Sequence, residues 1–238
     1  MRKTIGVFLL AAWACAAAAQ TPPPRLPPDQ QVLWNAYFQS VYDSAVYQRA
    51  NVRELFPLRA DHDGFVRVAT LGRRDGNVGG TITSTGEGIW VTLVPEVQMI
   101  CRHFTGDVPM QLRELLGLPP DADVPRFLVL LVKASDIFRP SPYAETITKY
   151  PCLDPASDPT CGNVFPSTAT PAHVQWIATA SFNLHAIPYG YPWTHLGYTY
   201  NWAPGKDRYG ASEYVIRAGA TAVIVQKATP AEYCSALP

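Results

Sequence analysis

Residues 209–225 read Tyr-Gly-Ala-Ser-Glu-Tyr-Val-Ile-Arg-Ala-Gly-Ala-Thr-Ala-Val-Ile-Val. Two runs that are rich in β-branched residues, 213–217 and 221–227, flank a short turn that contains Gly219. Short apolar runs separated by turn residues are typical of neighbouring antiparallel strands. The stretch therefore predicts two paired strands near the end of the chain, and Glu213 begins the first of them.

The same alternation of short apolar runs with Gly, Pro, Asp and Asn recurs through the chain. It predicts further strands at 65–71, 89–94, 127–133, 174–182 and 196–202. Helical spacing predicts a helix capped by Asp29 that continues to Ala45, a second helix from Asp107 to Leu116, and a third, shorter helix at 96–104. We therefore expect an α+β fold, with mostly antiparallel sheets flanked by two or three helices in a single domain, 29–238.

The first 19 residues have the pattern of an export signal. Arg2 and Lys3 precede an apolar stretch, and alanines at 16–19 provide small residues for cleavage before Gln20. The stretch is shorter than the roughly 18 apolar residues that span a bilayer, and Trp13 stands where a lipoprotein start needs a small residue. We predict a signal peptide at 1–19, a proline-rich spacer at 20–28, and a periplasmic or secreted protein without a membrane span after cleavage.

The composition is that of a globular protein without strong charge. Of the 238 residues, 47% are hydrophobic and 16% are charged, with 19 Lys and Arg against 19 Asp and Glu. No basic run rises above this balance, so no nucleic-acid partner is indicated.

Four cysteines remain after signal cleavage, and an oxidising compartment favours their pairing. Three pairings are open to them. The short spacing of Cys152 and Cys161 favours a local disulfide, which leaves Cys101 to pair with Cys234. No C-x-x-C or H-x-x-x-H spacing accompanies these cysteines, so we expect no metal site.

No common catalytic motif occurs in the sequence. The glycines at 76–80 lack the Lys-Ser/Thr of a phosphate-binding loop, and G-x-S-x-G and H-E-x-x-H are absent. The five histidines lie far apart along the chain, and each is expected in a surface or core role.

The densest aromatic stretch is 189–202, with six Tyr or Trp residues in fourteen positions. In a strand at 196–202, alternation places Tyr198, Tyr200 and Trp202 on one face. Their rings would either stack on a sugar or another flat ligand, or cover the core. This stretch supports one alternative function, a non-catalytic secreted module that binds carbohydrate or protein through residues 189–202.

Three earlier segments and the late strand pair fall into a specific order. Residues 64–71, Gly-Phe-Val-Arg-Val-Ala-Thr-Leu, place Arg67 in an early strand. Residues 88–93, Gly-Ile-Trp-Val-Thr-Leu, place Thr92 in a strand before a helix, and residues 124–133 add another apolar strand. With Glu213 beginning a late strand, this order resembles the ADP-ribosyltransferase toxin fold over roughly residues 58–133 and 209–228.

The resemblance implies a protein that binds NAD as a substrate and transfers ADP-ribose or hydrolyses NAD. It implies that Arg67, or its rival Arg59, contacts the pyrophosphate or ribose. Thr92 stands in place of the family's Ser-Thr-Ser and would hold the strand geometry. Glu213 would bind a ribose hydroxyl and balance the charge of an oxocarbenium-like transition state.

Two further expectations follow from the resemblance. Tyr198 or Trp202 would stack on the nicotinamide ring. Ser212-Glu213 replaces the family's Glu-x-Glu or Gln-x-Glu, whose first residue helps to position the acceptor, so the acceptor, a protein or a small molecule, is left unidentified.

Overall fold

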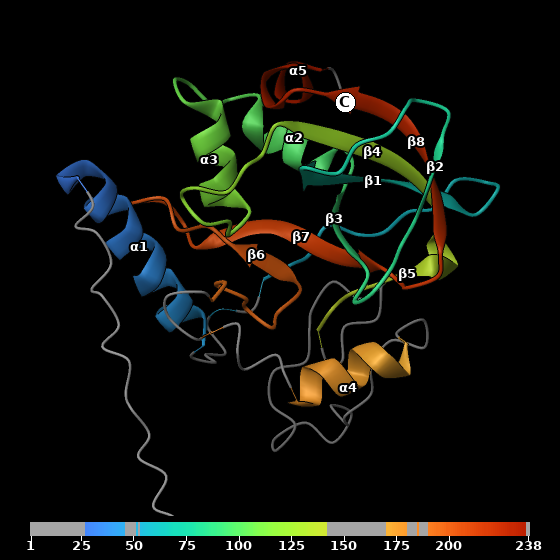
Figure 1. Ribbon diagram of the computed structural model, residues 1–238, viewed down its shortest axis with the longest axis horizontal. Helices are drawn as coiled ribbons and strands as arrows, with labels where there is room; N and C mark the ends of the chain where they lie inside the picture. Colours follow the sequence, from blue (N-terminus) through green and yellow to red (C-terminus); the bar gives the residue numbers. More distant parts are fainter. Residues whose placement is uncertain are drawn as a thin grey trace, which may run out of the picture.

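The described residues form an antiparallel β-sheet of eight strands (Figure 1), and one face of this sheet packs on a hydrophobic core. The structure is a computed structural model, and it describes residues 27–45, 51, 53–141, 170–179, 185 and 190–236. Seven strands lie in the order β2-β8-β4-β1-β3-β7-β5, and β6 pairs with β7. The strands are β1 (Phe65–Gly72), β2 (Thr81–Thr83), β3 (Ile89–Leu93), β4 (Arg126–Lys133), β5 (Ile137–Phe138), β6 (Tyr198–Tyr200), β7 (Tyr209–Ile216) and β8 (Thr221–Ala228).

The helices of the described part flank this sheet (Figure 1). Helices α2, α3 and α5 contact one another and the sheet, and α1 packs beside β6. Helix α4 lies at the bottom of the view in Figure 1, away from α5. The helices are α1 (Pro28–Ser44), α2 (Glu96–Cys101), α3 (Val108–Leu115), α4 (Pro171–Thr179) and α5 (Pro230–Ser235). The predicted α+β class is thereby confirmed.

Alternate residues of the strands face two different cores. Val66 and Val68 of β1 pack with Leu130 of β4 and Ile224 of β8 in the central core, which the sheet encloses. Ala69 faces the opposite way, into a second core beneath α2, α3 and α5. Because side chains alternate across a strand, each strand of this kind contributes to both cores. The periodicity in the sequence therefore predicted these strands well.

The starts of two helices test the predicted caps. Asp107 caps α3, since its carboxylate accepts a hydrogen bond from the Met110 N–H at 3.0 Å, as predicted. The prediction of Asp29 as the cap of α1 was wrong, because the helix begins at Pro28 after Pro27. Proline suits the first position of a helix since its φ is fixed there and it lacks the N–H that would be unpaired. Asp29 lies in the first turn instead.

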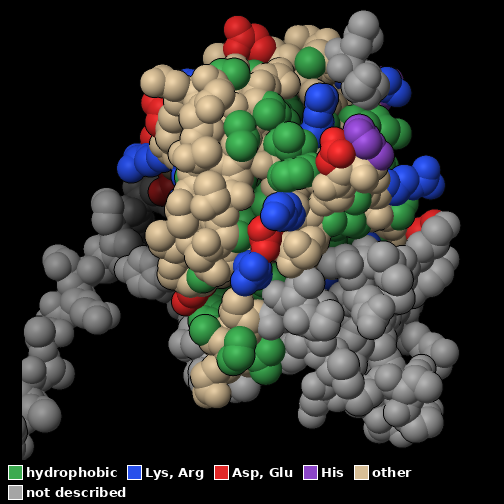
Figure 2. Space-filling view, turned by 90° about the vertical axis from the view of Figure 1, so that its right-hand side faces the viewer, with side chains coloured by type: hydrophobic (Ala, Val, Ile, Leu, Met, Phe, Trp, Pro, Cys, Tyr) green, Lys and Arg blue, Asp and Glu red, His purple; other side chains and the backbone are tan. Residues whose placement is uncertain are grey.

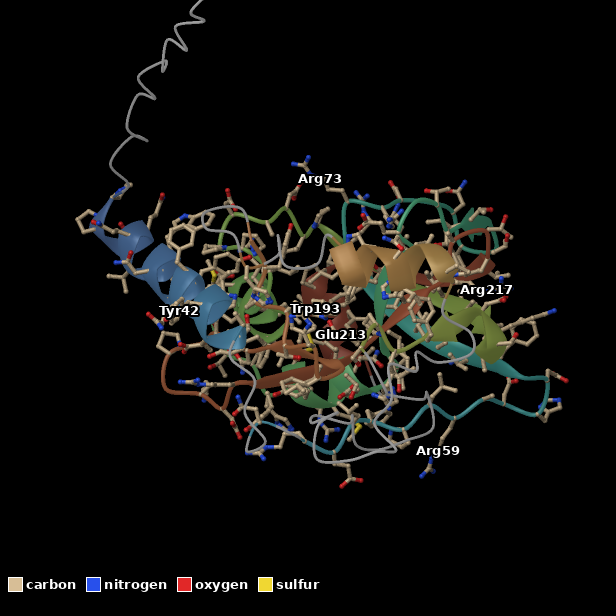
Figure 3. The ribbon with its side chains drawn as sticks, turned by 90° about the horizontal axis from the view of Figure 1, so that it is seen from below. Tyr42, Arg59, Arg73, Trp193, Glu213 and Arg217 are labelled. Carbon is tan, nitrogen blue, oxygen red and sulfur yellow. A yellow bond between two sulfur atoms is a disulfide. The ribbon has the colours of Figure 1, made fainter. Side chains whose placement is uncertain are left out.

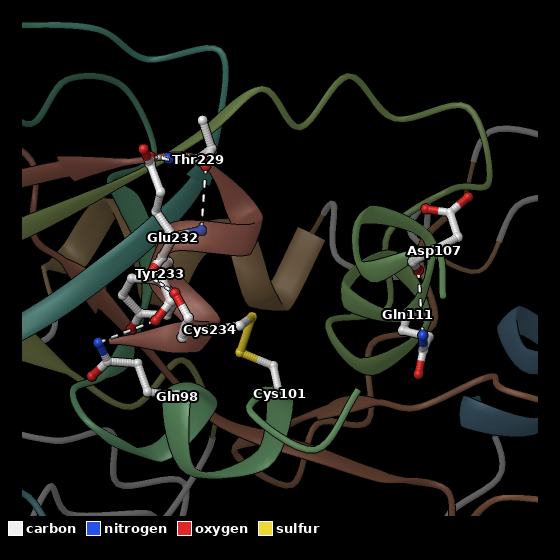
Figure 4. Close-up of a disulfide and its surroundings, with 9 residues drawn as sticks. Gln98, Cys101, Asp107, Gln111, Thr229, Glu232, Tyr233 and Cys234 are labelled. Carbon is white, nitrogen blue, oxygen red and sulfur yellow. Dashed lines mark hydrogen bonds between the residues drawn. A yellow bond between two sulfur atoms is a disulfide. The ribbon is translucent and has the colours of Figure 1, made fainter. Parts of the chain in front are cut away.

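A capping box and a disulfide fix the last helix (Figure 4). The Thr229 hydroxyl accepts from the Glu232 N–H, and the Glu232 carboxylate accepts from the Thr229 N–H. Cys101 of α2 is bonded to Cys234 of α5 across 133 residues, which confirms this predicted pair. A chain-entropy estimate for such a loop gives about 5 kcal/mol of stabilisation.

We expected a strand at 174–182. This prediction was wrong, because α4 occupies residues 171–179. Pro171 is the first residue of the helix. His173 and Trp176 lie three residues apart, on one face of the helix, and their rings contact those of Trp90 and Phe138. The rings of His173 and Trp176 thus pack the helix against the sheet, and this tertiary packing overrides the strand propensity of the segment.

Several predictions concern residues outside the described ranges. The signal peptide at 1–19 lies outside them, as do the spacer apart from residues 27 and 28, and the pair Cys152 and Cys161. Within the described ranges, no helix combines the length and the hydropathy that crossing a membrane requires.

Charged side chains of both signs are mixed on the face that Figure 2 shows. Lys and Arg stand next to Asp and Glu, and hydrophobic side chains lie between them. Among the described residues, Arg217 forms an ion pair with Asp136, and Lys227 forms one with Asp75. This face therefore presents no extended patch of one charge.

Candidate functional site

A pocket of about 430 Å³ lies against β3 and β7. The end of α3, helix α4 and the segment 191–193 form its other sides. The side chains that define its chemistry come from six separate parts of the chain. They are Leu71, Arg74, Glu87, Trp90, Thr92, Leu118, Trp176, Tyr191, Trp193 and Glu213.

Thr92 and Glu213 form the base of this pocket. They are direct partners in the antiparallel register of β3 and β7, so their side chains leave the sheet on the same face. Glu213 is 6% exposed and Thr92 is 7% exposed. The Thr92 hydroxyl has no hydrogen-bond partner within the described part of the chain. A buried hydroxyl without a partner favours a ligand or a water molecule as the missing one.

Trp193 holds the Glu213 carboxylate. Its indole N–H donates a hydrogen bond to Glu213 Oε1 at 2.9 Å, and Figure 3 shows the two side chains together at the centre of the molecule. Oε2 accepts no hydrogen bond from the described residues. Burial raises the pKa of Glu213 to about 8, although the indole hydrogen bond acts in the opposite direction. The carboxyl group is therefore poised to ionise near neutral pH.

A tight turn places Trp193 over Glu213. The Thr194 hydroxyl donates to the Tyr198 carbonyl at 2.6 Å and accepts from the Leu196 N–H at 3.1 Å. Gly197 completes the turn at φ +81, and a Cβ there would lie 3.0 Å from a Leu55 methyl carbon. Only glycine adopts this conformation in so little space at low cost. The turn thereby fixes the direction of the indole ring.

The His195 ring packs against the indole ring of Trp193. The two rings lie 3.9 Å apart between centroids, and His195 adopts φ +61, a costly conformation for a residue with a side chain. Its Nε2 lies 2.9 Å from Nε2 of His185, whose Nδ1 faces the Val41 carbonyl of α1 at 3.2 Å. Burial, followed by the charge of His185, lowers the pKa of His195 to about 3. This histidine pair is therefore neutral at physiological pH.

Three tryptophans from different elements form one side of the pocket, which we call the tryptophan wall. Trp90 is on β3, Trp176 is on α4 and Trp193 precedes β6. Their ring centroids are separated by 5.7 to 6.2 Å, so each ring contacts both others. Such a continuous aromatic surface next to a carboxylate suits a flat or cationic ring.

The end of α3 closes the opposite side through a close backbone contact. Gly117 has φ +66, and a Cβ at this position would lie 3.2 Å from the Tyr200 carbonyl oxygen and 3.2 Å from Pro192. The Thr199 hydroxyl donates to the Leu115 carbonyl at 2.8 Å. These contacts join α3 to β6 and set the width of the pocket between Leu118 and the tryptophan wall.

The structure places two of the five predicted site residues in this pocket, Thr92 and Glu213. Arg67 is exposed on β1, four residues from Leu71, which lines the pocket. At roughly 3.3 Å per residue, about 13 Å of strand separates them. The rival Arg59 is exposed and lies at the edge of the molecule in Figure 3, away from Glu213.

The two aromatic residues predicted to stack on nicotinamide lie outside the pocket lining. Tyr198 is 4% exposed and donates its hydroxyl hydrogen to the Asn51 carbonyl at 2.7 Å. Trp202 is 4% exposed, donates its indole N–H to the Leu118 carbonyl and contacts the Tyr37 ring of α1. Both rings therefore serve packing, and the tryptophan wall provides the aromatic surface in their place.

Sequence reasoning missed the tryptophan wall and Arg74. Arg74 is the one Lys or Arg side chain among the described residues that line the pocket. No motif marks it, since it follows β1 in a turn beside Arg73. Trp193 had a weak signal because it belongs to the dense aromatic stretch, whereas Trp90 and Trp176 had none.

A second buried carboxylate lies outside the pocket. Glu96 Oε1 accepts hydrogen bonds from the Ser212 N–H at 2.9 Å and from the Ser212 hydroxyl at 3.0 Å. Burial raises the pKa of Glu96 to about 7, and these two hydrogen bonds act against that rise. Glu96 thus holds α2 against β7 at Ser212, the residue before Glu213.

The described residues contain no group of three or more His, Cys, Asp or Glu that is arranged to hold a metal ion. No protein-family model, curated protein or solved structure matches this chain.

Proposed function

We propose that the protein binds NAD in this pocket and breaks the bond between nicotinamide and ribose, passing ADP-ribose to water or to another acceptor. One observation carries the proposal: Glu213 and Thr92 face each other at the base of a pocket bordered by the tryptophan wall. The strand order adds support, because the strands that carry Arg67, Thr92 and Glu213 are consecutive neighbours, β1-β3-β7.

The chemistry requires a negative charge beside the ribose. Nicotinamide leaves with the electron pair of the N–C1′ bond and so becomes neutral, while positive charge develops on the ribose. Water then adds to C1′ and loses a proton to the solvent. An ionised Glu213 stabilises the positive transition state and accepts a hydrogen bond from a ribose hydroxyl, and the unpartnered Thr92 hydroxyl is available for a second hydrogen bond to the sugar.

The protonation state of Glu213 sets the pH dependence. With a pKa of about 8, the free carboxyl group is mostly protonated at pH 7. A bound nicotinamide ring carries positive charge, which favours the ionised carboxylate. We therefore expect the rate at low NAD concentration to rise with pH until about pH 8.

Release of nicotinamide from NAD by the purified protein tests this proposal. Glu213→Gln keeps the size of the side chain and removes its charge, so we expect the rate to fall about 10²- to 10³-fold. Glu114→Gln is the matched control, since Glu114 is a half-buried carboxylate of α3 outside the pocket lining. No release by the wild type with water and candidate acceptors, or equal rates for the two variants, would contradict the proposal.

The tryptophan wall also favours a second function, the non-catalytic binding of carbohydrate or protein. Tyr191, which lines the same pocket, is 44% exposed, so the pocket presents one aromatic ring to solvent beside the tryptophan wall. Retention of the wild type on a glycan matrix, lost in Trp193→Ala and without any release of nicotinamide from NAD, would favour this function over the enzyme. Trp202→Ala would not test this function, because Trp202 is buried against α1.

A further inference from the structure

We infer that the pocket recognises the nicotinamide mononucleotide unit of its ligand, with the ring at the tryptophan wall and Glu213 and the adjacent phosphate at Arg74. The inference rests on the proposed function and makes it more specific. It states which part of the ligand the pocket contacts, and it assigns the phosphate to a residue that neither motif nor resemblance indicated.

The base of the pocket selects a cation. Trp193 holds the Glu213 carboxylate at 2.9 Å, and the indole ring of the same residue belongs to the tryptophan wall. A pyridinium ring on these indoles combines aromatic contact with the attraction of a positive charge to the ring faces. A neutral flat ring gains only the first of these contributions. The base is therefore complementary to nicotinamide while it is bonded to ribose.

The rim of the pocket selects an anion, because no described residue neutralises its arginine. Two neighbouring arginines are paired: Arg73 Nε lies 2.7 Å from Asp123, and Arg126 lies 3.2 Å from Asp75. Arg74 forms no hydrogen bond or ion pair with the described residues, and it is the residue of this group that lines the pocket. A guanidinium group suits the oxygens of a phosphate.

The size of the pocket favours one nucleotide over two. Its volume of about 430 Å³ lies in the lower part of the roughly 300–1,000 Å³ range of small-molecule sites. Besides the exposed Glu87 carboxylate, the described residues supply within this volume one buried carboxylate at the base, one aromatic side and one unpaired arginine. These three features match a cationic ring, a ribose and one phosphate. The adenosine half of NAD would extend from the rim into solvent.

Three substrates that differ by one group each test the inference. Nicotinamide riboside lacks the phosphate, nicotinamide mononucleotide carries it, and NAD adds the adenosine half. We expect Arg74→Ala to raise the KM for the mononucleotide and for NAD about tenfold, the loss of a charged hydrogen bond, and to leave the KM for the riboside unchanged. Arg73→Ala is the matched control, since Figure 3 shows Arg73 at the edge of the molecule, away from Glu213. It should change none of the three values.

The outcomes separate this inference from the proposed function. If the wild type cleaves these substrates but Arg74→Ala affects the riboside as strongly as the mononucleotide, the inference fails and the proposed function stands. A preference of a hundredfold or more for NAD over the mononucleotide would also overturn it, because the adenosine half would then be bound specifically.

If the wild type cleaves none of the three, the proposed function fails, and binding alone decides the inference. Quenching of tryptophan fluorescence by nicotinamide mononucleotide provides this readout, because the ring would lie on the tryptophan wall. We expect Arg74→Ala to raise the Kd for the mononucleotide about tenfold. An unchanged Kd, or no quenching of the wild type, would overturn the inference.

Discussion

Two buried carboxylates are found at successive positions of β7, and their surroundings differ. Glu213 is a residue of the strand, and Glu96 reaches the preceding residue, Ser212, from α2. Glu96 Oε1 accepts two hydrogen bonds from Ser212, one of them from the backbone. Glu213 accepts one hydrogen bond, from the Trp193 side chain, and lines a pocket. Burial raises the pKa of both groups, to about 7 for Glu96 and about 8 for Glu213.

The comparison shows that a raised pKa does not by itself indicate a functional group. Glu96 joins a helix to a strand, and its removal would leave a backbone N–H of β7 without its partner. The Glu213 carboxylate accepts no hydrogen bond from a backbone N–H of the described residues. It is held by one side chain and is open to a ligand on the other side. Both groups keep a carboxylate oxygen without a hydrogen bond from the described residues. The open space beside Glu213 therefore distinguishes the candidate catalytic carboxylate from the structural one.

The first difference that we expect between Glu96 and Glu213 concerns the free energy of unfolding. Glu96→Ala leaves the Ser212 N–H and hydroxyl without their acceptor, so we expect the free energy of unfolding to fall by about 1–3 kcal/mol. Glu213→Gln keeps a side chain that accepts from the Trp193 indole and should lower the stability far less at pH 7. Urea unfolding of both variants measures this difference. Equal losses would show that the distinction between the two carboxylates is wrong.

A smaller effect concerns the hydrogen bond from the Trp193 indole to the Glu213 carboxylate. Trp193→Phe retains an aromatic ring and removes the indole N–H, which lowers the pKa of Glu213 in the wild type. We expect the rate of nicotinamide release to fall about tenfold at pH 7.5, the value of one hydrogen bond to a charged group. The midpoint of the pH–rate profile should also move to higher pH.

Trp176→Phe is the matched control for that experiment. It makes the same change in the tryptophan wall at a residue whose contacts there are with aromatic rings. Its pH–rate midpoint should stay at the wild-type value. A shift of the same size in both variants would assign the effect to the wall as a whole and not to the bond between Trp193 and Glu213.

A further difference is the dependence of stability on pH. The folded protein binds the Glu213 proton more tightly than the unfolded chain does, because burial raises its pKa from the ordinary 4.5 to about 8. The stabilisation is complete below about pH 4.5 and is lost as the pH rises through 8. The wild type should therefore lose more stability than Glu213→Gln between pH 5 and pH 8.5. Urea unfolding at these two pH values measures the loss of stability in both proteins. Equal losses would show that Glu213 is not in an environment that raises its pKa.

Much of the fold was predictable because the strands alternate regularly. Strands β1, β3, β4 and β8 lie within one residue of the predicted bounds, since each is a short run rich in β-branched and apolar residues. The capping box at Thr229 and Glu232 was present in the sequence as T-x-x-E and would have revealed α5. Helix α4 was not predictable in this way, because aromatic packing of Trp176 decides its structure.

The candidate site was only partly predictable for a different reason. Glu213 and Thr92 could be proposed because each lies in a strand that the sequence predicts, and their pairing follows from the register. The expectation that Glu213 begins its strand was wrong, because β7 begins at Tyr209. The tryptophan wall depends on three elements that come together only in the folded protein. The dense aromatic stretch also misled, since Trp202 packs against α1 while Trp193, nine residues earlier, faces the pocket.

Proton release on ligand binding tests the central claim most directly, because it reports whether a cation meets the Glu213 carboxyl group. 1-Methylnicotinamide carries the ring charge and has no glycosidic bond to break, and nicotinamide is its neutral counterpart. Calorimetry at pH 7 in buffers of different ionisation enthalpy should show that 1-methylnicotinamide releases nearly one proton from the wild type, since the bound cation ionises a group with a pKa of about 8. Nicotinamide should release none from the wild type, and neither ligand should release one from Glu213→Gln. Binding of 1-methylnicotinamide without proton release, or with the same release from Glu213→Gln, would contradict the account.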